Sequence, residues 1–90
     1  MNRIVLRFGD VCTEPEIHAM LAQELSFPAH YGQNLDALYE LLTEIGAETL
    51  LVIDRPWHAR RIDGYVDRVL RVLEDAAGEN PHLKVEERRQ

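Results

Sequence analysis

The chain has 90 residues, of which 46% are hydrophobic and 29% are charged. This length and balance predict one globular domain spanning residues 1–90, and they exclude both a disordered chain and a multidomain protein. With 16 Asp and Glu residues against 10 Lys and Arg, the formal net charge is −6, which disfavours a nucleic acid as the partner.

The sequence has no segment typical of membrane insertion or secretion. Its apolar runs are far shorter than the roughly 20 residues of a membrane span, and residues 1–8 lack a secretory apolar region. Cys12 is the only cysteine, so no internal disulfide is expected. A lone thiol without a partner base favours a structural role for this residue. Together these features predict a cytoplasmic protein with no membrane partner.

The predicted elements begin with a strand and a helix. Apolar residues alternate over Arg3–Phe8, which is the period of a half-buried strand. Thr13 and Glu16 have the spacing of a capping box, so a helix is expected to begin directly after Thr13. An apolar stripe continues to Leu25, and the following Ser-Phe-Pro sequence ends this helix before Pro28.

A short loop and a second helix come next. Gly32 is expected to supply either a backbone shape or a close approach that a side chain would block, and Asn34 is placed to cap a helix from Leu35 to about Ile45. A helix stop follows at Gly46. The predicted buried stripe of this helix consists of Leu35, Leu38, Leu41, Leu42 and Ile45.

A buried strand is predicted over Thr49–Ile53. This compact run is apolar and partly β-branched, which favours a central strand covered on both faces. The connection 54–62 that follows has room for an extra short helical turn. Within it, Trp57 is expected to anchor the loop on the core.

The last predicted elements are a long helix and a short strand. Asp63 is placed to cap a helix over Gly64–Ala77, which Gly78 ends, and Pro81–Glu86 has the pattern of a strand. Residues 87–90 are expected to form a polar, frayed tail. Because helical segments separate the successive strands, the pattern predicts the α/β class, with a three-stranded parallel sheet packed against three main helices.

The sequence holds no motif that indicates catalysis, a metal or a cofactor. Neither a phosphate-binding glycine loop nor a nucleotide-binding fingerprint is present. The histidines are scattered without the spacing of metal ligands: His18, His30, His58 and His82. We therefore predict no catalytic residues, no metal site and no cofactor.

Charge is distributed unevenly along the chain. Between Phe8 and Asp54 there are nine acidic residues, counting Asp54, and no Lys or Arg. Such an excess favours a cationic partner, although it also serves solubility.

The second predicted helix concentrates part of this negative charge. Asp36 and Glu40 are four residues apart and share a face, which Tyr39 and Thr43 flank and Glu44 extends. Like charges at this spacing weaken an isolated helix by a few tenths of a kcal/mol. The face is therefore either a binding surface or a solvated side of the helix.

Residues 31–38, Tyr-Gly-Gln-Asn-Leu-Asp-Ala-Leu, resemble a signature of the barstar family of ribonuclease inhibitors. The preceding Leu-Ser-Phe-Pro sequence and the order of predicted elements over the whole chain are also similar to that family. The resemblance implies an inhibitor without enzymatic activity, whose second helix and preceding loop plug the cationic active site of a barnase-type ribonuclease or toxin nuclease. Acidic side chains then replace the substrate phosphates against Arg, Lys and His of the enzyme.

By position, Asp36, Glu40 and Asp75 match acidic interface residues of the family. Glu40 is one methylene longer than the family's best-known residue there and Asp75 is one shorter, while His30 and Ile45 replace aromatic interface residues. These departures leave the identity of the nuclease open. The resemblance and the helix face together predict the following partner-binding residues: His30, Tyr31, Gly32, Asn34, Leu35, Asp36, Tyr39, Glu40, Thr43, Glu44, Ile45 and Asp75.

Two residue roles and two other functions stay open at this level. Tyr31 either packs its ring under the loop or presents its hydroxyl to a partner. Asn34 is expected mainly as a cap, with partner contact second. The chain could instead be a barstar-like regulatory module with a non-nuclease cationic partner, or an enzyme with Asp36 and Glu40 as an acid/base pair in a concave pocket. We expect a monomer before the complex forms.

Overall fold

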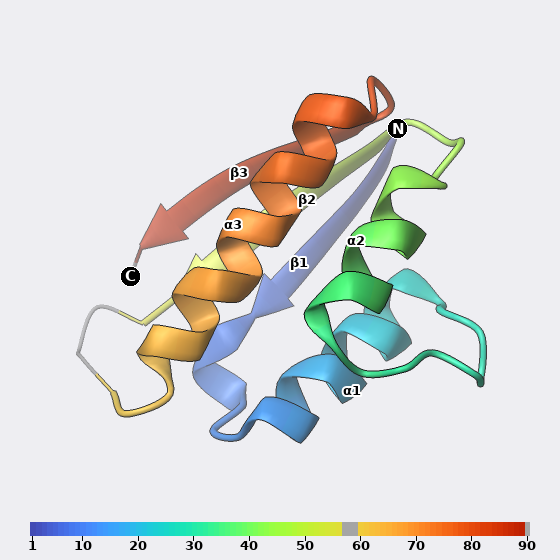
Figure 1. Ribbon diagram of the computed structural model, residues 1–90. Coiled ribbons are helices and arrows are strands. Elements are labelled where there is room, and N and C mark those ends of the chain that lie inside the picture. Colours follow the sequence, from blue (N-terminus) through green and yellow to red (C-terminus); the bar gives the residue numbers. More distant parts are fainter. Residues whose placement is uncertain (57–59, 90) are drawn as a thin grey trace.

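A computed structural model describes residues 1–56 and 60–89 of the chain (Figure 1). Trp57 and His58 lie outside the described residues, so the anchoring role of Trp57 stays a prediction. The observed elements confirm the predicted α/β class, with one parallel sheet and three main helices.

The sheet has three parallel strands in the order β1-β2-β3. The strands are β1 (Asn2–Arg7), β2 (Thr49–Arg55) and β3 (Leu83–Arg89). In the middle of the sheet, Val52 of β2 is aligned with Val5 of β1 on one side and with Glu86 of β3 on the other. The predicted central position of β2 is therefore confirmed.

The helices all lie on one side of this sheet (Figure 1). They are α1 (Glu14–Leu25), α2 (Leu35–Thr43) and α3 (Asp63–Glu79). Right-handed crossovers between strands in sequential order place their helices on the same face. Helices cover the face of β2 that carries Leu51 and Ile53, while Val52 on the opposite face is also 0% exposed, so β2 is buried on both faces although the described helices lie on one.

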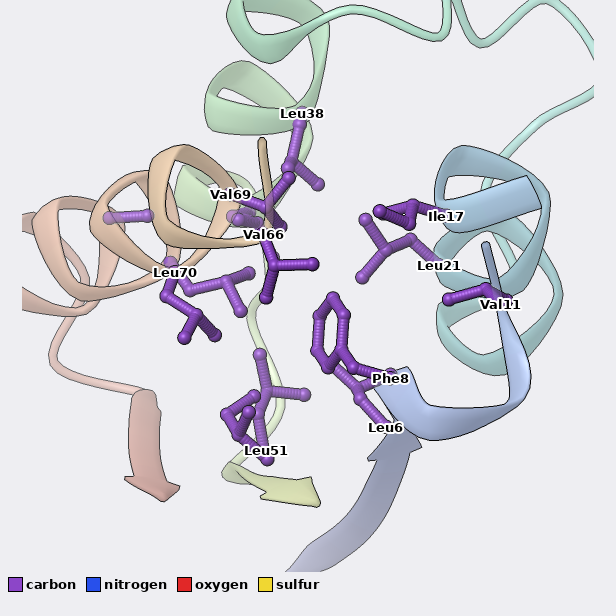
Figure 2. Packing of buried hydrophobic residues seen from close by; sticks show 14 of the residues in the cluster. Leu6, Phe8, Val11, Ile17, Leu21, Leu38, Leu51, Val66, Val69 and Leu70 are labelled. Carbon is purple, nitrogen blue, oxygen red and sulfur yellow. The ribbon is translucent and has the colours of Figure 1, made fainter. Parts of the chain in front are cut away.

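The core lies between this sheet face and the three helices. Figure 2 shows Leu6, Phe8 and Leu51 from the sheet side directed toward Ile17 and Leu21 of α1, Leu38 of α2, and Val66, Val69 and Leu70 of α3. Full burial of each large apolar side chain contributes about 1.5–3 kcal/mol. This shared core fixes α2 and α3 side by side against the sheet.

Two strands are longer than the sequence pattern predicts. β2 continues past Ile53 to Arg55, and β3 covers Leu83–Arg89 instead of Pro81–Glu86. Residues 87–89 are therefore part of the sheet and not a frayed tail. Their backbone pairs with Ile53 and the two residues after it, and polar side chains at the edge of a sheet can stay in water while the backbone pairs.

The helix ends also differ from the prediction. α2 stops at Thr43, two residues before the expected end. Asp63 is the first residue of α3 and not its cap, because its carboxylate accepts a hydrogen bond from the backbone N–H of Arg60 (2.8 Å). α3 continues through Gly78 and is capped by Asn80.

The described residues of the connection 54–62 include a single hydrogen-bonded turn, in which the backbone N–H of Asp63 donates to the carbonyl of Arg60 (3.1 Å), but no helix is assigned there. A 3-10 turn is also found at Phe8–Asp10, directly after β1. This turn leads the chain from the edge of the sheet toward α1, and its Phe8 side chain is buried in the core.

Candidate partner-binding surface

The outer face of α2 is acidic. Leu38 and Leu42 on its inner face are 0% exposed, so the opposite face points to solvent. That face carries the exposed side chains of Asp36 and Glu40, and Glu44 extends it at the C-terminal cap. Among the described residues, no hydrogen bond or ion pair occupies these three carboxylates. They are therefore available to bind cations of a partner.

The start of α2 is fixed by Asn34, which confirms the predicted cap. Its Oδ1 accepts a hydrogen bond from the backbone N–H of Ala37 (2.8 Å), and its Nδ2 donates to the carbonyl of Gly32 (3.2 Å). A Cβ on Gly32 would lie 3.1 Å from that Nδ2, so the expected close approach at this glycine is also present. The left-handed backbone conformation belongs to its neighbour Gln33, with φ of 52°.

Tyr31 holds the loop before α2 against the rest of the fold. The residue is 9% exposed, its ring centroid lies 4.9 Å from that of Phe27, and its backbone N–H donates to the carbonyl of Pro28 (3.0 Å). The Tyr31 hydroxyl lies 2.6 Å from Nδ1 of His18. Of the two roles open in the sequence, the structure shows the packed ring, with the hydroxyl bound inside the protein.

His18 lies at the centre of a polar cluster at the edge of the core, formed with Tyr31 and Tyr65. It is 2% exposed, and its Nε2 lies 2.7 Å from the hydroxyl of Tyr65 on α3. Burial lowers the pKa of His18, although the charge of Glu14 opposes this shift. Burial also raises the pKa of Tyr31 to about 12. The cluster joins α1, the loop and α3, and it thereby fixes the position of the loop.

Sequence reasoning assigned no role to His18. Its burial could have been inferred from its position beside Ile17 and three residues before Leu21, at the edge of the apolar stripe of α1. The two tyrosine partners come from distant parts of the sequence, so their convergence on one imidazole could not be derived from spacing.

Asn80 is a second residue that sequence reasoning missed. Its side chain is buried, and its Nδ2 donates to the backbone carbonyls of Leu42 and Ile45, both at 2.9 Å. Its Oδ1 accepts a hydrogen bond from the backbone N–H of His82 (2.9 Å). Carbonyls at a helix end lack partners within the helix, so Asn80 satisfies this end of α2 and ties it to the start of β3.

The other predicted residues around the acidic face have varied surroundings. Tyr39 and Ile45 are half-buried and pack against the core, while His30 is exposed on the loop. The hydroxyl of Thr43 donates to the backbone carbonyl of Glu40 (2.8 Å), so it is already bound within α2. The exposed parts of these side chains border the acidic face.

Asp75 is brought close to α2 by the packing of α3. Its side chain is exposed and lines a groove of about 360 Å³ that Leu35 of α2 also lines. Asp36 and Leu35 line an adjoining hollow of about 450 Å³. The structure therefore places Asp75 and Asp36 on neighbouring parts of one surface.

The part of the chain that the structure describes contains no group of three or more His, Cys, Asp and Glu side chains with the arrangement of a metal site. No described helix combines the length and apolar character needed to cross a membrane. The thiol of Cys12 is free and exposed.

Comparison with known proteins relates the chain to one family and to a curated relative. The family described as "Barstar (barnase inhibitor)" matches residues 1–89. The chain is also 33% identical over 81 residues to a Bacillus subtilis (strain 168) protein named "Putative ribonuclease inhibitor YrdF". That alignment covers 88% of this chain and 89% of the relative.

Proposed function

The chain belongs to the barstar family, and from this membership we propose that it inhibits a ribonuclease by inserting α2 and the loop before it into the cationic active site. Asp36 and Glu40 take the place of substrate phosphates, and Asp75 contributes from α3. The inhibitor supplies no bond that the enzyme can cleave, so binding blocks the site without any reaction. No cofactor takes part.

The unoccupied carboxylates of α2 are the observation that carries this proposal. A ribonuclease cleft is cationic because its substrate is anionic, and arginine binds a carboxylate through two parallel hydrogen bonds. Asp36 and Glu40 are exposed on one helix face, with no cation of the described residues paired to them. The net charge of −6 adds a long-range field that accelerates association with a basic enzyme.

The scaffold of the surface supports the same role. The loop is held by the contact of Tyr31 with His18, the start of α2 by Asn34, and its end by Asn80. A surface that is already ordered loses less conformational entropy on binding. Rigid presentation of charges therefore favours an inhibitor over a segment that folds on contact.

The two alternative functions make different demands on this surface. An acid/base enzyme needs its carboxylates in a water-restricted pocket, whereas Asp36 and Glu40 are exposed on an outward helix face. A regulatory module uses the same face but binds a basic protein that is not a nuclease. We propose that the inhibitor acts in the cytoplasm as a monomer before complex formation.

The partner can be identified by affinity capture from the cell that makes this protein, together with any secreted nuclease of that cell. Elution with salt and sequencing of the eluted protein identify a cationic partner, and an RNA-cleavage assay decides whether it is a ribonuclease. A captured basic protein without nuclease activity would favour the regulatory module.

The role of the acidic face is tested by Glu40→Ala in an inhibition assay with barnase and with the captured enzyme. Loss of one side of a buried charge pair is expected to weaken binding by about 2 kcal/mol or more. Glu24→Ala on α1 is the matched control, because it removes the same charge from another exposed helix position. Equal effects of the two variants, or an unfolded Glu40→Ala, would contradict the proposal.

A further inference from the structure

A groove between α2 and α3 adjoins the acidic face and carries cations. Its volume is about 360 Å³, and its walls include Leu35 and Val72 together with Arg68 and Arg71. The adjoining hollow that Asp36 lines shares Leu35 and Arg68 with it. A partner that covers the acidic face of α2 therefore also covers this groove.

The charges of the groove are not balanced within the protein. Asp67 lies in the groove wall, but its carboxylate is 2.7 Å from a guanidinium nitrogen of Arg55, which also lies 3.9 Å from the carboxylate of Glu87. Among the described residues, neither Arg68 nor Arg71 has a carboxylate oxygen within 4.0 Å. Among the described wall residues, Asp75 is thus the one carboxylate without an ion-pair partner, against two such guanidinium groups.

Arg68 is also oriented by its surroundings. Its guanidinium carbon lies 5.6 Å from the centre of the Tyr65 ring, a cation–π distance. Tyr65 is itself fixed through its hydroxyl, which lies 2.7 Å from Nε2 of His18. The polar cluster that holds the loop therefore also positions one cation of the groove.

We infer that this groove receives an acidic side chain of the partner protein, with Arg68 and Arg71 as the residues that bind its carboxylate. A guanidinium presents several donors in a plane that matches a carboxylate. The apolar surfaces of Leu35 and Val72 suit the methylene groups of an inserted Asp or Glu. Asp75 disfavours a more highly charged group such as a phosphate in the same place.

This inference rests on the proposed function and adds a requirement for the partner. A suitable ribonuclease carries an Asp or Glu beside its cationic cleft, at the position that faces α3. A nuclease with basic residues facing Arg68 and Arg71, and not only facing Asp75, would bring like charges together, which disfavours binding and thereby restricts the choice of partner. Arg68 and Arg71 are thus specificity-determining residues of the inhibitor.

The test is the double variant Arg68→Gln/Arg71→Gln in the inhibition assay. Arg3→Gln/Lys84→Gln is the matched control, because it removes two exposed cations from β1 and β3 that have no ion pair among the described residues, and it makes the same change in net charge. Unfolding in urea establishes that both variants are folded. Because Arg68 and Arg71 are exposed, their replacement is expected to leave stability nearly unchanged.

With the captured and purified ribonuclease, the groove variant is expected to lose at least about tenfold in affinity relative to the control. Arg71→Lys, which keeps the charge but not the planar donor pair, is expected to lose less than Arg71→Gln. With barnase, whose cleft is cationic, we expect the groove variant to bind more tightly than the control.

Each outcome separates this inference from the proposed function. If Glu40→Ala weakens inhibition but the groove variant behaves like its control with both enzymes, the groove assignment is wrong and the inhibitor function stands. If the unmodified protein inhibits neither enzyme, the proposed function fails and the inference falls with it.

Discussion

Replacement of Tyr31 by Phe tests whether the buried polar cluster holds the fold together. The change removes only the hydroxyl, which lies 2.6 Å from Nδ1 of His18, and keeps the ring that packs against Phe27. The imidazole is 2% exposed, so the nitrogen that loses its partner has little access to water. The substitution therefore separates the hydrogen bond from the packing of the loop.

The expected cost follows from this burial. A hydrogen bond with both partners accessible to water contributes about 0.5–1.5 kcal/mol, whereas a buried group left without a partner costs about 1–3 kcal/mol. Because His18 is almost fully buried, we expect Tyr31→Phe to lower the free energy of unfolding by about 1–3 kcal/mol. In a domain of this size, each kcal/mol corresponds to a fall in Tm of roughly 4–8 °C.

The measurement is urea unfolding at pH 7, with the slope against urea unchanged if the variant still unfolds in two states. Tyr39→Phe is the control, because no described residue forms a hydrogen bond with the Tyr39 hydroxyl, and we expect a change within about 0.5 kcal/mol. If the two variants are equally stable, the hydroxyl of Tyr31 does not contribute to stability and the reasoning is refuted.

Three further predictions concern pH, the end of α2 and association. Burial lowers the pKa of His18 in the folded protein, so as the pH falls below about 6.5 the unfolded state takes up a proton at this histidine before the folded state does. The free energy of unfolding therefore decreases with falling pH in this range, by at most about 1.4 kcal/mol per pH unit. Urea titrations between pH 7.5 and 5 check this decrease, which His18→Gln is expected to reduce. Asn80→Ala removes the hydrogen bonds to the carbonyls of Leu42 and Ile45 and is expected to lower the free energy of unfolding by about 2–3 kcal/mol. A decrease below about 1 kcal/mol in urea unfolding would show that these hydrogen bonds do not hold the end of α2. In stopped-flow mixing with the partner, the association rate is expected to fall steeply with salt while dissociation changes less; a flat association rate would exclude electrostatic steering.

Local sequence patterns predicted the features that depend on neighbouring residues. The capping box is one example, since Oγ1 of Thr13 accepts from the backbone N–H of Glu16 at 3.3 Å and the Glu16 carboxylate accepts from that of Cys12 at 3.1 Å. The cap at Asn34 and the buried stripe through Leu38 are others. Each depends on contacts a few residues apart, which the periodicity of a helix specifies.

The acidic face was predicted for the same reason, while its surroundings were not. Asp36 and Glu40 share a face by spacing alone, but the nearness of Asp75 and the cationic groove beside it depend on how α3 packs against α2. The family resemblance indicated Asp75 by position and gave no indication of Arg68 or Arg71. Their placement in one groove required the packed helices.

Tertiary structure alone decided which polar residues are buried and on which side of the sheet the helices pack. His18 became a core residue because Tyr31 and Tyr65, from separate segments, supply partners for both ring nitrogens, and a buried polar group is stable only when it is satisfied. Asn80 joined the core for the same reason, through the carbonyls of Leu42 in α2 and of Ile45 just after it, which precede Asn80 by more than thirty residues. The apolar sequence of β2 specified a central strand, but the sequential strand order with crossovers of one hand put every helix on a single face.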